Sequence, residues 1–404
     1  MPNRQAVLAV LVAMSWLLNG GTTRADTDPM QACDTLATVT LRALPEIAAV
    51  QCGSRFFGYQ AAVDRDTTDG EPAYDYCPFL MWDRQVGLYR LYTGGRWLRK
   101  GIPWADGDHI LHFVSPSGGA GTWFMPRNRP EVWNPAEEGQ PDTWYSGNCL
   151  EPEVVKVQGT YYMYAQVQGN PKADMSDPQV TEAAGVDRIV LFTSDDGFCW
   201  RRASAARGVV VGFDAPAATV LHHQEVIYVP WDAEGKPFWL YVAAGVEGKS
   251  LGYVRMRSDD PTTYDWQARE PAGLAQLGNQ IGYAKQAPGG PLLVRITFTG
   301  GKDGKTAPTL QFSRDGLAWS FGDDGPALLA GSDDDDKNRN CYFLALSTLD
   351  GTGELEYVGD NTYRALYAAT TCSTPVAPEI FHSEIGLGEL VLHIEPREVG
   401  GAPQ

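Results

Sequence analysis

The sequence predicts an all-β fold, a five-bladed β-propeller, from its composition, a repeated turn motif and a repeated pair of strands. Glycine (44 residues) and proline (27 residues) are frequent among the 404 residues, and aromatic residues make up 11%. Many turn-forming residues beside many aromatic residues are typical of β-sheet proteins with many hairpins. A hydrophobic content of 43% allows a large core and argues against a disordered chain or a coiled coil.

The chain is acidic, with a formal net charge of −18. Nucleic-acid-binding proteins need basic patches to neutralise phosphate, so this balance argues against nucleic acid as a partner. The acidic run Asp333–Asp336, followed by Lys337, is interpreted as a solvated loop, with a calcium-binding loop as the alternative. The sequence has no phosphate-binding loop and no dinucleotide fingerprint. We therefore expect no required cofactor and leave only a structural calcium ion open.

Residues 1–25 have the features of a secretory signal. Arg4 provides a positive start, Ala6–Leu18 form an apolar stretch, and Thr23–Ala25 provide a small-residue cleavage pattern. The apolar stretch is too short to span a bilayer. We expect a secreted or periplasmic monomer whose mature chain is not inserted in a membrane, with an uncleaved anchor as the alternative.

All seven cysteines lie beyond residue 25. Export favours disulfides, and the odd number leaves one cysteine outside the pairs. The pairs that we expect are Cys33–Cys52, Cys77–Cys149 and Cys341–Cys372, with Cys199 outside them. Because the sequence has no CxxC pair, it predicts no structural zinc site.

A turn motif of the form Ser-x-Asp-Gly-x-x-Trp repeats along the chain. It occurs at Ser194–Trp200 and at Ser313–Trp319, and looser copies begin at Ser115 and Ser258. Ser and Asp oxygens accept backbone N–H groups at a turn, and Gly takes the position with positive φ. The Trp is expected on the returning strand, beneath the turn. The motif predicts hairpins of one kind, which we call Asp-box-like turns.

A pair of strands precedes each of the first three such units and begins at an X-Pro step. The prolines Pro78, Pro152 and Pro216 stand 37, 42 and 42 residues before the serine of the next turn. Further units begin at Asn279 and Asn340. This regular spacing describes four-stranded units, which is typical of propeller blades.

The predicted organisation has three parts. Residues 1–25 form the signal peptide, residues 26–74 an N-terminal extension and residues 75–400 the five-bladed propeller. Within the extension, Gln31–Val50 is rich in Ala and Leu and favours a helix, while a strand that closes the ring is the other interpretation. Two β-sandwiches are the alternative architecture for the whole chain.

Carboxylates stand at the predicted starts of the first three blades: Asp75, Glu151 and Asp214. Propeller strands converge at their starts around a central funnel, so we expect these side chains to share one pocket. Glycoside hydrolysis needs one protonated and one ionised carboxyl group beside the scissile bond. A third carboxylate raises the pKa of the acid by like-charge repulsion. Asp83 and Glu153 are alternative candidates on neighbouring strands.

The order of these elements resembles that of the five-bladed β-propeller glycosidases, which include the arabinanase and β-xylosidase group and the invertase and levanase group. The segments that carry the resemblance are Cys77–Gly95, Glu151–Tyr164 and Phe192–Trp200. The resemblance implies a glycoside hydrolase that cleaves a glycan or oligosaccharide by carboxylate acid/base chemistry.

The resemblance also implies a role for each carboxylate. Asp75 would be the base or nucleophile, Glu151 the general acid and Asp214 the residue that raises the pKa of the acid. In the arabinanase-like group the acid follows the second Asp along the chain, whereas here Glu151 precedes Asp214. A carbohydrate-binding propeller without catalysis is therefore the alternative, and a phosphorolytic relative is a further one.

Aromatic residues near strand starts or between blades are candidates for stacking on a sugar. These candidates for substrate binding are Trp82, Trp104, Trp144, Tyr145 and Tyr283. The adjacent histidines His222 and His223 are interpreted as ordinary core or surface residues.

Overall fold

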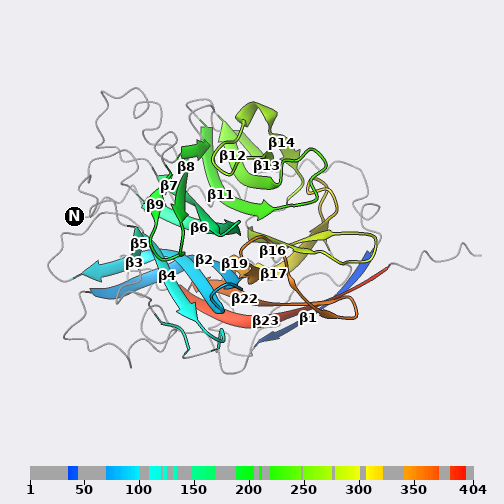
Figure 1. Ribbon diagram of the computed structural model, residues 1–404, viewed down its shortest axis with the longest axis horizontal. Helices are drawn as coiled ribbons and strands as arrows, with labels where there is room; N and C mark the ends of the chain where they lie inside the picture. The colour runs from blue at the N-terminus through cyan, green and yellow to red at the C-terminus, as the bar shows by residue number, and fades with distance from the viewer. Residues whose placement is uncertain are drawn as a thin grey trace, which may run out of the picture.

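The computed structural model describes residues 35–43, 70–99, 109–119, 122–124, 131–133, 148–168, 188–203, 209–211, 219–246, 249–274, 278–300, 306–321, 341–372 and 383–396. These residues form five β-sheets around a central axis (Figure 1). A three-residue 3-10 helix at Trp266–Ala268 is the exception to an all-β structure in these ranges.

Each sheet is one blade, described here from its innermost strand outwards. Blade 1 contains β2 (Gly70–Asp83), β3 (Leu88–Arg99), β4 (His109–Ser115) and β5 (Glu131–Trp133). Blade 2 contains β6 (Asn148–Val157), β7 (Thr160–Gln168) and β8 (Arg188–Ser194), with β9 (Arg201–Arg202) and β10 (Val209–Val211) both paired with β8. Blade 3 contains β11 (Thr219–Tyr228), β12 (Phe238–Val246), β13 (Lys249–Ser258) and β14 (Glu270–Ala272).

The last two blades follow the same order. Blade 4 contains β15 (Gly278–Ala284), β16 (Leu292–Gly300), β17 (Thr306–Ser313) and β18 (Ser320–Phe321). Blade 5 contains β19 (Cys341–Leu346), β22 (Thr362–Cys372), β23 (Ser383–Pro396) and β1 (Thr35–Ala43), with β21 (Glu356–Gly359) also paired with β22. Between them, β20 (Thr348–Leu349) leaves blade 5 and pairs in parallel with β2 of blade 1.

The innermost strands form a closed ring. Along the chain β2, β6, β11, β15 and β19 each contact the next, and β19 contacts β2. The five-bladed propeller predicted from the sequence is therefore confirmed, and the alternative of two β-sandwiches is wrong.

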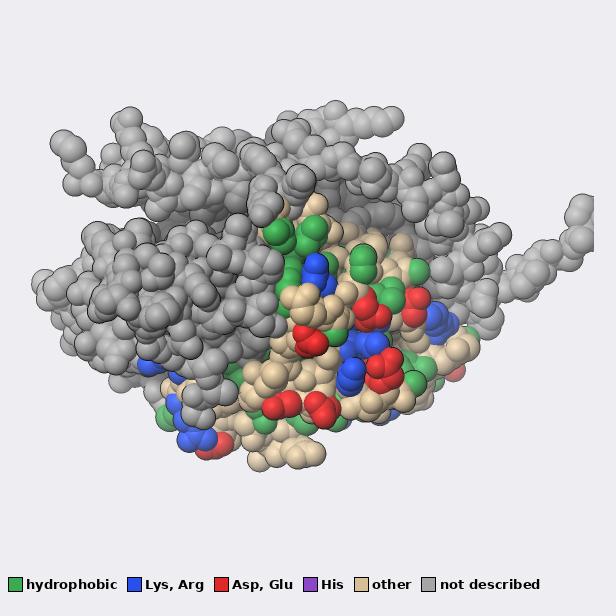
Figure 2. All heavy atoms as spheres, turned by 90° about the horizontal axis from the view of Figure 1, so that it is seen from above, with side chains coloured by type: hydrophobic (Ala, Val, Ile, Leu, Met, Phe, Trp, Pro, Cys, Tyr) green, Lys and Arg blue, Asp and Glu red, His purple; other side chains and the backbone are tan. Residues whose placement is uncertain are grey.

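The hydrophobic core is divided into layers between neighbouring blades. On β2, Phe79 and Met81 pack towards blade 2, whereas Leu80 between them packs towards blade 5. Successive side chains of a strand point to opposite faces of the sheet, so a strand buried on both faces must be apolar along its length. This explains apolar runs such as Phe79–Met81. At the surface, acidic and basic side chains lie next to one another (Figure 2).

The N-terminal strand belongs to the last blade. β1 pairs antiparallel with β23 from Thr35 opposite Pro396 to Ala43 opposite Gly388. The helix favoured over Gln31–Val50 is therefore wrong for these nine residues, because their alternating Thr and Val suit a pleated strand. β2 begins at Gly70, five residues before the predicted domain boundary. Residues 1–25 lie outside the described part of the chain.

The Asp-box-like turns have the predicted hydrogen bonds. In blade 2, Ser194 Oγ accepts the N–H of Gly197 at 2.8 Å, and Asp196 Oδ1 accepts two further backbone N–H groups at 2.7 Å. In blade 4, Ser313 Oγ accepts the N–H of Gly316 at 2.8 Å, and Trp319 Nε1 donates to the Gly316 carbonyl at 3.1 Å. The sequence-based interpretation of this motif is confirmed.

Each of these two turns also joins its blade to the preceding one. Arg90 and Tyr92 on β3 of blade 1 donate to the carbonyl oxygen of Gly197, at 3.1 and 3.0 Å. Tyr241 on β12 of blade 3 donates to the carbonyl oxygen of Gly316 at 3.0 Å. The sequence motif therefore stabilises the ring as well as the local hairpin.

Replacing Asp315 by Ala is expected to lower the free energy of unfolding by about 0.5–1.5 kcal/mol, because the exposed N–H groups of Leu317 and Ala318 lose their acceptor to water. Burial raises the pKa of Asp315, but these donors outweigh it and lower the pKa below its ordinary value. The contribution is thus present above pH ~4 and lost as the pH falls further. Urea unfolding of the wild type and variant at pH 7 and pH 3 measures it; the exposed Asp259→Ala control should unfold like the wild type.

The expected disulfide between Cys77 and Cys149 does not form. Cys149 is a free thiol in the apolar layer between blades 1 and 2, where burial raises its pKa. Cys77 instead lies with its Sγ 4.0 Å from Glu151 Oε1. The two cysteines stand on neighbouring innermost strands but point to different surroundings. Cys33–Cys52 and the side chains of Cys341 and Cys372 lie outside the described part of the structure.

Candidate functional site

The innermost strands of blades 1 to 3 are interrupted by β-bulges. The strand pairing shifts between Tyr76 and Phe79 on β2, between Leu150 and Glu153 on β6, and between His222 and Glu225 on β11. At each bulge one residue other than glycine has a left-handed backbone: Cys77 (φ 49°), Glu151 (φ 54°) and His223 (φ 49°). Such strain costs on the order of 1–3 kcal/mol and concentrates at functional sites. The backbone strain therefore makes these three residues candidates for a functional site.

The bulges bring the three side chains together near the axis. Glu151 Oε2 accepts the backbone N–H of His223 at 2.9 Å. Glu151 Oε1 lies 2.9 Å from His223 Nδ1, an ion-pair distance without hydrogen-bond alignment, and 4.0 Å from Cys77 Sγ. All three residues are at most 9% exposed. Both oxygens of Glu151 are therefore in contact with groups of His223.

Two glutamine side chains hold the bulges in place. Gln224 Nε2 donates to the backbone carbonyl of Glu151, and to that of Tyr164 at 3.3 Å. Gln166 Oε1 accepts from the N–H of His223 at 3.4 Å. Both the backbone and the carboxylate of Glu151 therefore form hydrogen bonds with blade 3.

A second acid lies beside Glu151 on the same strand. Glu153 is buried, and its pKa is raised well above the ordinary range by burial and by the charges of Glu225 and Glu151, against a weaker effect of the Val226 N–H. This environment favours the protonated form of Glu153. Glu225 is also buried and forms an ion pair with Arg295, whose Nε lies 2.9 and 3.0 Å from its two oxygens.

The structure describes only some of the predicted catalytic residues. Glu151 lies in the cluster, although inside β6 rather than at its start. Asp75 lies on β2, two residues before Cys77 and opposite Gly95, and its side chain is outside the described part of the structure. Asp214 is also outside it, as are Trp104, Trp144 and Tyr145.

Two of the predicted substrate-binding residues lie at the other end of their strands. Trp82 stands next to the last residue of β2 and packs on Tyr89, with ring centroids 4.6 Å apart. Tyr283 is next to the last residue of β15, is buried, and packs on Trp231 at 4.7 Å. The structure therefore does not bring these two aromatic residues to the Glu151 end of the axis.

Asp83, the other alternative carboxylate, has a structural environment. It is fully buried, at 2.8 Å from Arg90 Nε and 2.7 Å from Lys156 Nζ, and it accepts a hydrogen bond from the hydroxyl of Tyr161. Burial raises its pKa, but Lys156, Tyr161 and Arg90 together lower it below the ordinary value. Asp83 is therefore an ionised counterion for two buried cations.

The prolines explain why sequence reasoning missed His223. Pro78 and Pro152 were interpreted as strand starts, yet they lie inside β2 and β6 at the bulges, where a residue without an N–H group is tolerated. The equivalent position in blade 3 is Gln224, not Pro216. A usable signal was present, since Glu153-Val154 and Glu225-Val226 each follow a bulge residue by two positions.

The opposite end of the axis is closed by a segment of blade 5, Thr348–Leu355, which we call the strap. Its Asp350 N–H donates to the carbonyl of Trp82 at 2.8 Å, and its Asp350 and Thr352 carbonyls each accept at 3.0 Å, from the N–H groups of Lys156 and Tyr228. Its Gly353 carbonyl accepts from the N–H of Tyr283 at 2.6 Å. The strap thus joins the ends of β2, β6, β11 and β15.

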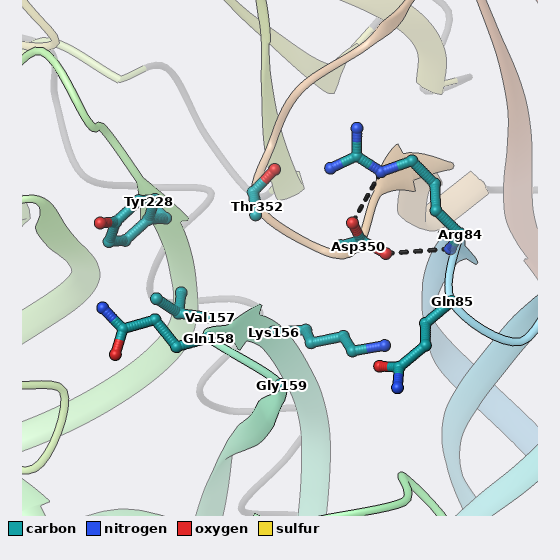
Figure 3. Close-up of a pocket in the computed structure, with 9 residues that line it drawn as sticks. All are labelled: Arg84, Gln85, Lys156, Val157, Gln158, Gly159, Tyr228, Asp350 and Thr352. Atoms are coloured by element: carbon teal, nitrogen blue, oxygen red, sulfur yellow. Dashed lines mark hydrogen bonds and ion pairs between the residues drawn. The ribbon is translucent and has the colours of Figure 1, made fainter.

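A cavity of about 360 Å³ lies beside the strap (Figure 3). Its lining residues are Arg84, Gln85, Lys156, Val157, Gln158, Gly159, Tyr228, Asp350 and Thr352. Arg84 Nε lies 2.7 Å from Asp350 Oδ2, whereas the side chains of Gln158 and Tyr228 point away from this ion pair (Figure 3). Five strand residues, roughly 16 Å, separate this end from the bulges.

Metal binding has no support in the described part of the chain. There, no group of three or more His, Cys, Asp or Glu side chains is placed to hold a metal ion. The acidic run Asp333–Asp336 lies outside these residues. In the same ranges, no helix has the length and apolar character needed to span a membrane.

Comparison with known proteins identifies the fold. No family model matches the sequence, and no curated protein matches it. Among solved structures, a complex of BT0996 with RGII is 13% identical with a TM-score of 0.53, and a structure described as "Glycoside hydrolase" is 12% identical with a TM-score of 0.52. Each match covers 86% of this protein and 92% of the other. The protein therefore shares its five-bladed β-propeller fold with a glycoside hydrolase of known structure.

Proposed function

We propose that the protein is an exported glycoside hydrolase, secreted or periplasmic, that cleaves a glycan or oligosaccharide with acid/base chemistry centred on Glu151. One observation carries the proposal. Three strained bulges on neighbouring innermost strands bring Glu151, Cys77 and His223 together at one end of the propeller axis. The shared fold with a glycoside hydrolase is consistent with this chemistry.

Hydrolysis of a glycoside requires two proton transfers. A general acid protonates the glycosidic oxygen as the C–O bond breaks, and a second carboxylate either takes a proton from the attacking water or attacks the sugar itself. We assign the acid role to Glu151 and retain Asp75 as the base or nucleophile, since it lies two residues before Cys77 on β2. Asp214 is retained as the third carboxylate.

The charges around Glu151 support this assignment. Burial and neighbouring charges raise the pKa of Glu153, whereas Glu151 accepts the N–H of His223 and lies beside its imidazole. Enzymes commonly use neighbouring carboxyl groups whose environments favour different protonation states. A substrate oxygen that approaches Glu151 therefore meets one group that can exchange a proton rather than two like charges.

Replacing Glu151 by Gln tests the proposal. On a panel of aryl glycosides and oligosaccharides we expect the wild type to hydrolyse at least one substrate and the variant to lose about 10²–10⁴-fold in kcat/KM. Glu234→Gln, at an exposed ion pair with Arg257, is the matched control and should keep full activity. A wild type that hydrolyses none of the substrates, or an unaffected Glu151→Gln variant, would falsify the proposal.

The second candidate is a carbohydrate-binding propeller without catalysis. It is favoured by the burial of the cluster, because both oxygens of Glu151 are already engaged by His223. A glycan array, followed by incubation of each bound glycan with the protein, decides between the two. Binding without any product supports the binding module, and product formation excludes it.

A further inference from the structure

The environment of Glu151 creates a conflict for a general acid. A general acid must carry a proton when the substrate is bound. Glu151, however, accepts the N–H of His223 at Oε2 and faces the imidazole at Oε1, so that both of its oxygens contact one residue. If Glu151 is the acid, its proton has to come from a partner within reach.

His223 is that partner by position. Its Nδ1 lies 2.9 Å from Glu151 Oε1, a distance across which a proton can pass, and such contacts often align only when the substrate is bound. A buried Glu–His pair holds one dissociable proton in two arrangements, as a carboxylic acid beside a neutral imidazole or as a carboxylate beside an imidazolium. The 2.9 Å contact therefore allows the two residues to share one proton.

In the described part of the structure, the groups around Glu151 and His223 are less suited than this pair to hold the proton. Among the described residues, the titratable groups that face the pair are Cys77 on β2, Glu153 on β6 and Glu225 on β11, and Arg295 on β16 pairs with Glu225. Burial and the charges of Glu225 and Glu151 raise the pKa of Glu153, and the charge of Glu225 is matched by Arg295. The thiol of Cys77 is a weak donor at 4.0 Å.

We propose that Glu151 and His223 act as one proton-transferring unit, in which Glu151 is the catalytic acid and His223 the positioning residue that supplies its proton. This inference rests on the proposed glycoside hydrolysis. It gives His223 the task of controlling the protonation of the acid, for which the sequence suggested Asp214.

The proton balance of the step is complete. The one dissociable proton of the pair moves from His223 Nδ1 to Glu151 Oε1, and from there to the glycosidic oxygen as the C–O bond breaks, so that the leaving group departs as an alcohol. The pair is then a carboxylate beside a neutral imidazole, and His223 takes up one proton from solvent to restore it. The water that adds to the sugar gives its proton to the second carboxylate, which releases it to solvent. One water is consumed and no net proton is gained or lost.

The test compares leaving groups. For the sugar that the wild type hydrolyses fastest, a methyl glycoside needs protonation of its leaving oxygen, whereas a 2,4-dinitrophenyl glycoside does not. His223→Asn keeps an amide nitrogen near the position of Nδ1 but cannot transfer a proton. We expect kcat/KM to fall about 10²–10⁴-fold on the methyl glycoside and less than about tenfold on the dinitrophenyl glycoside.

Two further variants identify the unit. Glu151→Gln should show the same dependence on leaving group, and the double variant should be no slower than either single variant, because residues that act as one unit are not additive. His393→Gln is the matched control, since His393 Nε2 lies 3.0 Å from Glu395 Oε1 in an exposed pair. Its kinetics should equal those of the wild type.

The outcomes separate the two proposals. A wild type without activity on any glycoside overturns the proposed function and this inference with it. An active wild type whose His223→Asn and His223→Gln variants slow both substrates equally, or change only KM, overturns this inference alone. Thermal unfolding of each variant shows whether it is folded, and the dinitrophenyl glycoside reports an intact site within the same preparation.

Discussion

Replacing Gly351 by Ala is expected to lower the free energy of unfolding by roughly 2–5 kcal/mol. About 1–2 kcal/mol comes from placing a side chain at a left-handed backbone position, φ +66°, and about 1–3 kcal/mol from overpacking. A Cβ at this position would overlap the carbonyl oxygen of Val154, which is backbone in the middle of β6 and cannot rotate away.

The cost is large because Gly351 lies in the middle of the strap. The hydrogen bonds from Asp350 on one side and from Thr352 and Gly353 on the other reach β2, β6, β11 and β15. A shift of the strap that relieves the overlap must lengthen several of these bonds at once. Each buried backbone group left without a partner costs about 1–3 kcal/mol, so a shift of the strap would itself be strongly destabilising.

Gly235→Ala separates the overlap from the backbone strain. Gly235 has nearly the same backbone angle, φ +71°, with no atom within 4 Å of an added Cβ. Its substitution should cost about 1–2 kcal/mol only. Urea unfolding of both variants at one temperature gives the comparison. Equal midpoints for Gly351→Ala and Gly235→Ala would mean that the strap is not packed against β6.

The parts of the fold that depend on neighbouring residues were predictable. The Asp-box-like turns follow from hydrogen bonds within five residues, and their sequence predicts each acceptor, from Ser194 and Asp196 to Ser313 and Asp315. The alternation of apolar residues within a blade is equally local. For this reason the number of blades was predicted correctly although no family model matches the sequence.

The parts that depend on distant segments were not predictable. β1 pairs with β23 across almost the whole chain, and the sequence offered a strand that closes the ring only as the alternative to a helix, because nothing near Thr35 specifies that partner. The strap is a short turn-rich segment whose hydrogen bonds extend to Trp82, Lys156 and Tyr228, each in a different blade. The partners of such segments are defined only once the blades are assembled into the ring.

The candidate site shows the same division. Glu151 was predicted as a carboxylate at a blade start, before Pro152, and from the family resemblance, whereas Cys77 and His223 lie 74 and 72 residues from it. A β-bulge permits a proline inside a strand, so Pro78 and Pro152 do not indicate strand starts. Once the bulges are aligned, His223 follows as the blade 3 equivalent of Glu151.

Replacing Asp83 by Ala is expected to lower the free energy of unfolding by about 3–5 kcal/mol, the usual cost of removing one partner from a buried ion pair. Arg90 and Lys156 would both lose this counterion, and Arg90 is fully buried. Because the pKa of Asp83 is lowered in the folded protein, its contribution is present above pH ~4 and is lost as the pH falls further. The wild type should therefore lose more stability than Asp83→Ala between pH 7 and pH 3.

The exposed pair of Glu356 and Arg364 is the matched control. Its atoms are 3.0 Å apart, close to the distances around Asp83, yet both side chains are more than 40% exposed. Glu356→Ala should cost less than about 1 kcal/mol. Urea unfolding at pH 7 measures both changes, and similar midpoints for the two variants would contradict the structural role of Asp83.

A comparison of Asp83→Ala with Glu151→Gln separates effects on stability from effects on catalysis. Asp83 lies at the strap end, roughly 16 Å along the strand from the bulges. Asp83→Ala should therefore unfold at lower urea concentration while the folded fraction keeps its kcat at low temperature. Glu151→Gln should show the reverse, because the amide oxygen can still accept the N–H of His223 but the side chain cannot transfer a proton. A loss of kcat in folded Asp83→Ala would restore Asp83 as a catalytic candidate and weaken the assignment of the site to the bulges.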